Sequence, residues 1–111
     1  GACPGHSLTG FVYLQEDAET RLPLPGTRVL LEKQEDGSAV NNSVTASDGS
    51  FYLGQVFPGK YVLRLDRTGL PKGCSIPEET HSIEVEPARH ITEYKCRPFV
   101  VLAASAPENE K

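Results

Sequence analysis

The 111-residue sequence has no methionine and no tryptophan, and it lacks both a basic excess and a long apolar run. Its 11 Lys and Arg and 15 Asp and Glu are dispersed, so no basic stripe exists to release counterions from nucleic acid. The longest nearly uncharged stretch, residues 98–107, is far shorter than the ~20 apolar residues of a membrane-spanning helix. We therefore expect no nucleic-acid partner and no membrane span. The missing initiator methionine predicts a mature fragment or an excised module.

Helical periodicity is also missing, whereas short runs of period-2 alternation recur along the chain. The clearest run has Tyr61, Leu63 and Leu65 on one face, which predicts a strand with one buried face and one solvent-exposed face. Seven such runs separated by short turns predict a single all-β sandwich. The expected strands cover residues 8–14, 27–33, 40–46, 50–53, 61–66, 81–86 and 90–102.

Glycine and proline mark the turns between these runs. Asp48-Gly49 and Pro58-Gly59 bracket one hairpin, and residues 22–25 hold two prolines, which restricts them to an edge or a turn. We expect residues 1–6 to be an N-terminal extension or linker, residues 7–104 the sandwich domain, and residues 105–111 a disordered tail or linker.

Four blocks of the sequence form a family pattern: Thr9–Tyr13, Leu24–Leu31, Thr45–Leu53 and Val56–Leu63. Together they resemble the transthyretin-like (prealbumin-like) superfamily, whose relatives include carboxypeptidase regulatory-like domains and the Cna B-type repeats of bacterial surface proteins. The resemblance implies a seven-stranded Greek-key β-sandwich. Leu70-Pro71-Lys72-Gly73 also looks like the Leu-Pro-x-Gly of surface-protein repeats.

Two chemical features of such repeats can be checked against this sequence. The isopeptide bond of some repeats needs a Lys in the first strand and an Asn or Asp in the last, and neither is present, so we predict no isopeptide bond. Calcium-binding repeats carry alternating oxygen ligands in the loop after the first strand. Here Glu16, Asp17 and Glu19 lack that alternation, so they are weak calcium candidates and a solvated loop is the alternative.

Cys3, Cys74 and Cys96 match no zinc or redox motif. We predict a disulfide between Cys74 and Cys96, which would tether a loop to the sheet and place the protein outside the cytoplasm. Pairing of Cys3 with either partner, or three free thiols, are the alternatives. Gly1-Ala2-Cys3 resembles the end of a bacterial lipoprotein signal, so a lipid anchor at Cys3 is a further alternative to a cloning remnant.

No combination of residues predicts an enzyme. The chain has no Gly-x-Ser-x-Gly turn and no recognisable nucleophile with its base, and His81 and His90 are more simply surface histidines than metal ligands. We therefore expect neither catalysis nor a cofactor.

Aromatic side chains offer a candidate ligand face, formed by Phe11, Tyr13, Tyr52 and Tyr94. Exposed rings could stack on sugars or on a protein, and packing of Phe11 and Tyr13 beneath residues 22–25 is the alternative. Asn41-Asn42-Ser43 is a sequon that would place a glycan on Asn41 in a eukaryotic secretory pathway.

The leading hypothesis is a non-catalytic, extracytoplasmic (secreted, cell-surface or periplasmic) structural or adhesive module of a larger protein. It would space or dock neighbouring domains, another protein or a surface glycan, with strand addition at the polar segment 40–46 as one route. The alternatives are a carbohydrate-binding module and an accessory domain of an outer-membrane usher or pilus-assembly machine.

Overall fold

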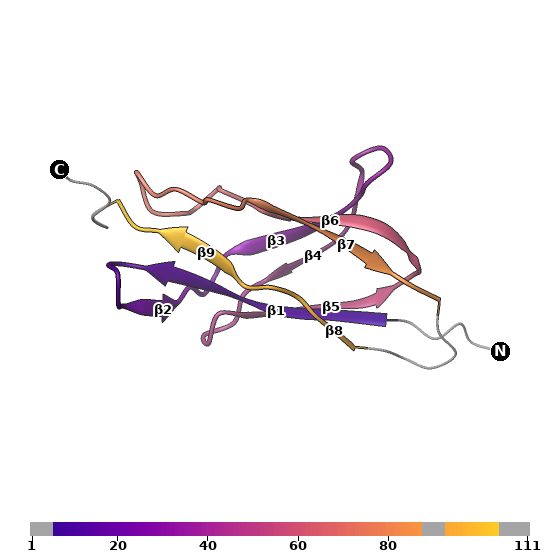
Figure 1. Ribbon diagram of the computed structural model, residues 1–111, viewed down its shortest axis with the longest axis horizontal. Coiled ribbons are helices and arrows are strands. Elements are labelled where there is room, and N and C mark those ends of the chain that lie inside the picture. Colours follow the sequence, from indigo (N-terminus) through magenta and orange to yellow (C-terminus); the bar gives the residue numbers. More distant parts are fainter. Residues whose placement is uncertain (1–5, 88–92, 105–111) are drawn as a thin grey trace.

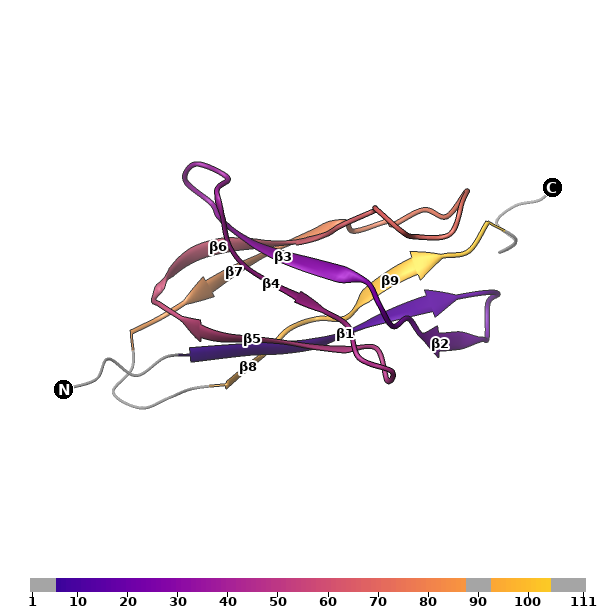
Figure 2. The same cartoon turned by 180° about the vertical axis from the view of Figure 1, so that it is seen from behind.

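A computed structural model describes residues 6–87 and 93–104, and these residues form two β-sheets packed face to face (Figure 1 and Figure 2). None of the described residues forms a helix long and apolar enough to cross a membrane. The strands are β1 (His6–Gln15), β2 (Arg21–Pro23), β3 (Arg28–Lys33), β4 (Ala39–Val44), β5 (Ser50–Val56), β6 (Gly59–Leu65), β7 (Thr80–Val85), β8 (Glu93–Lys95) and β9 (Phe99–Leu102).

The two sheets are built differently. One is antiparallel throughout, in the order β4-β3-β6-β7. The other is organised around β1, whose first half pairs with β5 and β8 and whose second half pairs with β2 and β9. Both β8 and β9 run parallel to β1. The described chain therefore begins at one end of the long axis and finishes at the other, in a molecule of 58 × 28 × 20 Å (Figure 1).

The predicted all-β sandwich is confirmed, with two changes in its strands. Residues 22–23 form part of a short strand at the outer edge of the β1 sheet, which suits a proline without an N–H donor. The single strand expected over residues 90–102 is wrong: the described part divides into β8 and β9, separated by Cys96, Arg97 and Pro98. His90 lies outside the described residues.

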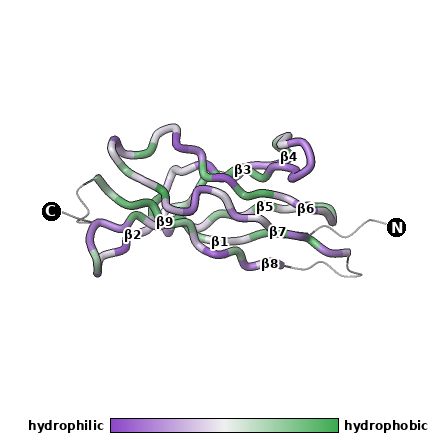
Figure 3. The backbone as a smooth tube through the Cα atoms, turned by 45° about the horizontal axis from the view of Figure 1, so that its top comes forward, coloured by the Kyte–Doolittle hydropathy of each residue, from purple (hydrophilic) through white to green (hydrophobic). Residues whose placement is uncertain are grey.

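The alternating apolar residues fill the space between the sheets, as the sequence predicts. Tyr61, Leu63 and Leu65 are all buried. Hydrophobic stretches run along the strands, whereas the segment around β4 is largely hydrophilic (Figure 3). Each large apolar side chain that is fully buried contributes roughly 1.5–3 kcal/mol. The buried core consists of Leu8, Val12, Val29, Leu31, Phe51, Leu53, Val56, Tyr61, Leu63, Leu65, Ile76, Val85, Phe99 and Val101.

Two histidines belong to this interior, contrary to the surface placement expected for His81. His6 is the first residue of β1, one position before the expected domain boundary, and it packs edge-on against Tyr94 at 5.8 Å between ring centroids. His81 stacks on Phe99 at 4.2 Å, with the ring planes 3° apart. Both imidazoles are buried, and neither nitrogen of His6 nor Nδ1 of His81 has a hydrogen-bond partner. The rings therefore act as flat core side chains.

Candidate functional site

Three rings gather on the solvent side of the β1 sheet, and we call Phe11, Tyr13 and Tyr52 the outer aromatic face. Alternation along β1 buries Leu8 and Val12 and turns Phe11 and Tyr13 outward. Phe11 and Tyr13 stack at 5.8 Å with their planes 9° apart. Phe11 is 41% exposed and Tyr52 62% exposed. The register places Tyr52 opposite Thr9 and diagonally beside Phe11, so the three rings form one surface.

Polar groups border this surface on both sides. The Arg21 guanidinium lies over the Tyr13 ring, 5.8 Å from its centroid. On the β8 side, the Thr9 hydroxyl donates a hydrogen bond to the Glu93 carboxylate at 3.1 Å, and Lys95 lies opposite Thr9. A shallow depression of about 350 Å³ lies between the rings and β8. The face therefore combines ring surfaces with hydrogen-bonding side chains, a combination that suits sugar or protein ligands.

Tyr94 does not join the outer aromatic face, so that part of the prediction is wrong. It lies opposite Leu8, on the core side of β8, and it packs against the core half-buried. Its hydroxyl accepts a hydrogen bond from the Glu86 N–H at 3.1 Å. The irregular residues 96–98 explain the change of side, because Tyr94 and Phe99 can both face inward only if the alternation is interrupted between them.

In the acidic loop after β1, the Asp17 carboxylate accepts hydrogen bonds from the backbone of the loop itself. Asp17 Oδ1 accepts hydrogen bonds from the backbone N–H groups of Glu19 and Thr20, both at 2.8 Å. These bonds hold the pKa of Asp17 below its usual range. Within residues 6–87 and 93–104, no three His, Cys, Asp or Glu side chains gather closely enough to hold a metal ion. Calcium binding by Glu16, Asp17 and Glu19 thus has no geometric support there.

The predicted disulfide is absent, since Cys74 and Cys96 are both free thiols. Ser75, the neighbour of Cys74, pairs with Leu102 at the far end of β9, whereas Cys96 precedes β9. Strand β9 alone spans roughly 10 Å at about 3.3 Å per residue. A disulfide needs Cα atoms within about 7 Å of each other. Cys3 lies outside the described residues, so its pairing and the lipid anchor stay predictions.

Cys96 and His81 line one small cavity of about 190 Å³, so a thiol and an imidazole face the same space. Burial raises the pKa of the Cys96 thiol to about 11, so it stays protonated at neutral pH. A reactive cysteine needs the opposite shift. Burial, and then the positive charge of Arg97, lower the pKa of His81, although Glu78 partly opposes this. The pair therefore has the character of core packing.

The open side of the sandwich, where β4 and β5 run side by side, is closed by side-chain hydrogen bonds. Asn41 Nδ2 donates to the Gly54 carbonyl at 3.0 Å, and the Tyr52 N–H donates to Ser43 Oγ at 3.3 Å. The nitrogen that a glycan would modify thus links the two sheets; glycosylation of Asn41 stays a prediction. Val40 and Val44 remain exposed on β4, the outermost strand of its sheet.

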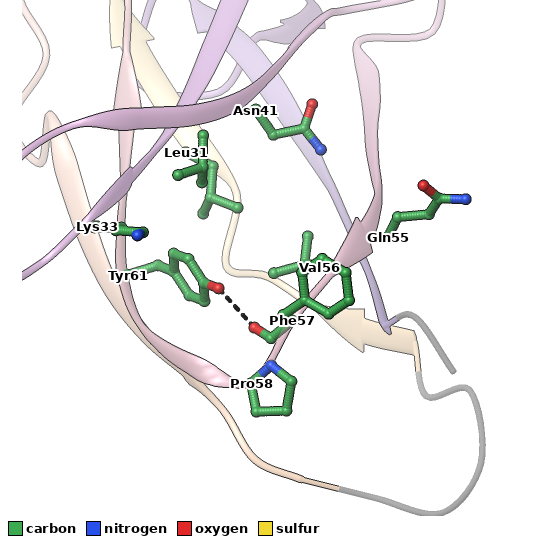
Figure 4. A pocket seen from close by; sticks show the side chains of 9 residues that line it. Leu31, Lys33, Asn41, Gln55, Val56, Phe57, Pro58 and Tyr61 are labelled. Carbon is green, nitrogen blue, oxygen red and sulfur yellow. Dashed lines mark hydrogen bonds between the residues drawn. The ribbon is translucent and has the colours of Figure 1, made fainter. Parts of the chain in front are cut away.

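A second cavity, which sequence reasoning missed, lies beyond this link at the end of the molecule where β1 begins. We call it the end pocket; its volume is about 380 Å³ (Figure 4). The Tyr61 hydroxyl forms part of its wall and donates to the Phe57 carbonyl at 2.6 Å. No motif marks this pocket in the sequence, because its walls come from β3, β4, β5, β6 and the β5–β6 turn. It is lined by Leu31, Lys33, Val40, Asn41, Gln55, Val56, Phe57, Pro58 and Tyr61.

Solved structures with this fold come from unrelated sources. The chain superposes on the minor pilin GBS52 of Streptococcus agalactiae with a TM-score of 0.69 and 16% identity, covering 96% of this chain and 48% of the pilin. It matches the plantain pollen allergen Pla l 1 with a TM-score of 0.67 and 16% identity, covering 95% of this chain and 98% of the allergen. It superposes on the major pilin SpaD of Corynebacterium diphtheriae with a TM-score of 0.60 and 16% identity, covering 88% of this chain and 32% of the pilin.

These likenesses establish the fold, and the chain spans about half of the minor pilin. A search of curated protein sequences finds no match. The family model described as "BOS complex subunit NOMO1-like, second beta sandwich domain" matches residues 3–89. That match covers all of the strands from β1 to β7. The chain therefore belongs to the family of NOMO1-like second β-sandwich domains.

Proposed function

We propose that the chain is a non-catalytic, extracytoplasmic structural module of a larger protein, which spaces and docks neighbouring domains or another protein. The observation that carries this proposal is the parallel pairing of the last strands with the first. Because β1 and β9 run in the same direction, the chain enters at one end of the sandwich and leaves at the other. A module of this kind extends a multidomain chain.

Another observation supports the same function. The family description refers to a domain of a complex subunit, which fits a part within a larger assembly. Because Cys74 and Cys96 form no disulfide, that bond no longer supports an extracytoplasmic location. The proposed location depends instead on the resemblance to the repeats of surface proteins.

Small-angle scattering of the longer protein tests the spacing role. Deletion of this chain should shorten the maximum dimension by about the 58 Å of its long axis. Replacement by an unrelated sandwich of similar length, also with parallel first and last strands, is the matched control and should restore the dimension. An unchanged dimension after the deletion would contradict the proposal.

Carbohydrate binding is a second candidate, favoured by the near-parallel rings of Phe11 and Tyr13 on an exposed surface. Titration with cellotetraose, followed by NMR, should shift resonances of Phe11 and Tyr52, and Phe11→Ala should abolish the shifts. Phe57→Ala is the matched control, since Phe57 is an exposed ring remote from this face. Shifts that persist in Phe11→Ala would reject sugar stacking on the outer aromatic face.

The role of usher or pilus-assembly accessory domain stays a prediction, because the likeness to pilins at 16% identity concerns the fold. Strand addition is supported to the extent that β4 lies at the edge of its sheet with Val40 and Val44 exposed.

A further inference from the structure

The core-facing row of β3 ends in a lysine. Val29 and Leu31 are fully buried, and Lys33 follows them on the same side of the strand. Lys33 lies opposite Tyr61, another buried residue of the inner face. Lys33 itself is exposed, so its side chain meets solvent at the end of this inward-facing row, where it lines the end pocket.

The end pocket that this lysine borders is otherwise apolar in its depth. Leu31, Val56 and Tyr61 form a buried floor, while the Val40 side chain is 46% exposed and Phe57 57% exposed at the rim. Figure 4 shows Lys33 and Asn41 on opposite sides of the cavity. Large apolar side chains left in water around a cavity are typical of a docking surface.

The polar groups around the pocket are already engaged, with one exception. The Tyr61 hydroxyl donates to the Phe57 carbonyl, and the Asn41 amide donates to the Gly54 carbonyl. Gln55 points away from the cavity (Figure 4). Lys33 is the charged lining residue, and in the described part of the chain it forms no ion pair within 4.0 Å. A group that fills the pocket can therefore gain one new ionic contact, to a negative charge.

The pocket also lies where the chain begins its first strand. His6 pairs with Val56, whose side chain forms part of the pocket floor. A domain that precedes β1 would thus be held within reach of the pocket. The exposed apolar rim formed by Val40 and Phe57 suits a protein surface better than a small molecule, because small-molecule sites enclose most of their ligand.

We propose that the end pocket receives an apolar side chain with an adjacent carboxylate, from a loop of the domain that precedes this one in the longer protein. The apolar group fills the space above Leu31 and Val56, and the carboxylate pairs with Lys33. The identity of the partner rests on the proposed function, whereas the chemistry of the pocket does not. This contact would fix the angle between two successive modules.

The chemistry can be tested on this chain with 3-phenylpropanoate as a probe that joins a ring to a carboxylate. In NMR titrations we expect shifts at Leu31, Val56 and Phe57, and about threefold weaker binding of the neutral 3-phenylpropan-1-ol, the effect of one exposed ion pair. Lys33→Glu should abolish the preference for the acid. Lys60→Glu, which changes a lysine outside the end pocket, should retain it. Equal affinities for the acid and the alcohol, or shifts confined to other surfaces, would overturn the proposal.

The partner can be tested on a two-domain fragment of the longer protein. NMR relaxation should show the two domains tumbling together in the wild type and in Lys60→Glu, and more independently in Lys33→Glu. Independent tumbling of the wild type would overturn the docking contact, yet would leave the spacing role intact if deletion of the module still shortens the protein. An unchanged length after deletion would instead reject the spacing role.

Discussion

Position 49 requires glycine for two reasons, its backbone angle and the close approach of neighbouring atoms. Its φ is 81°, and an added Cβ would lie 2.6 Å from the Val12 carbonyl oxygen. We predict that Gly49→Ala lowers the free energy of unfolding by more than ~2 kcal/mol, because left-handed strain of roughly 1–2 kcal/mol adds to a backbone clash. Urea denaturation measures the loss. Gly37→Ala is the control: φ is 75° but no atom lies within 4 Å, so a loss equal to that of Gly49→Ala would contradict the role of the clash.

We predict that His81 makes the free energy of unfolding depend on pH. Burial first, and then Arg97, lower its pKa below the ordinary value of 6.5. The unfolded chain therefore takes up a proton before the folded chain does, so the free energy of unfolding is fully retained above pH 6.5 and falls as the pH drops below it. Urea midpoints measured from pH 7.5 down to about pH 5 should decrease.

The matched variant for this prediction is His81→Phe, which keeps a flat ring against Phe99 but cannot titrate. Its midpoints should vary less over the same range. Asp17, Asp36, Asp48 and Asp66 all have lowered pKa values, so their contribution is lost at more acidic pH, below about 4. A wild-type decrease that His81→Phe reproduces in full would show that another group titrates.

At the scale of elements, the link between β4 and β5 depends on Asn41. We predict that Asn41→Ala costs about 1 kcal/mol of stability, since the Gly54 carbonyl loses its part-buried partner. The freed edge should also promote self-association, which size-exclusion chromatography detects. Asn42→Ala, which removes an exposed hydrogen bond to Arg28, should change neither property appreciably. Similar behaviour of the two variants would refute the special role of Asn41.

Alternation predicts a strand well where it continues without a break. The rows Leu8 and Val12, and Tyr61, Leu63 and Leu65, are buried as their spacing indicates. The alternation fails to predict burial where a strand contains an extra residue. Leu53 and Val56 are both buried although they are three positions apart, because the register shifts and Gln55 takes a φ of 56° between them.

The same failure explains the errors at the end of the chain. An interruption over residues 96–98 turns Tyr94 inward, and local sequence shows only Pro98 as its sign. The burial of His81 and the separation of Cys74 from Cys96 depend on β7, β9 and the loop before β7 meeting across the fold. Polarity and spacing along the chain do not show which distant segments contact each other in the fold. The end pocket could not be predicted for the same reason, because its walls come from several strands.

The whole molecule depends on strands outside the family match. The match ends at residue 89, yet Phe99 and Val101 from β9 are fully buried in the core. We predict that truncation after residue 89 abolishes cooperative thermal unfolding, because β1 loses two parallel partners and the core loses two large side chains. Removal of residues 105–111 alone is the control and should leave the transition intact. A cooperative transition in the shorter chain would show that β1 to β7 suffice.

The parallel pairing of β1 with β9 also determines how the domain responds to a pulling force. Tension between neighbouring modules would draw β1 toward one end and β9 toward the other, along the direction of the strands. The ladder from Val12 and Phe99 to Gln15 and Leu102 would then be loaded in shear, with its hydrogen bonds strained together and not opened one at a time. The topology that extends the chain is therefore also the one that resists its being stretched.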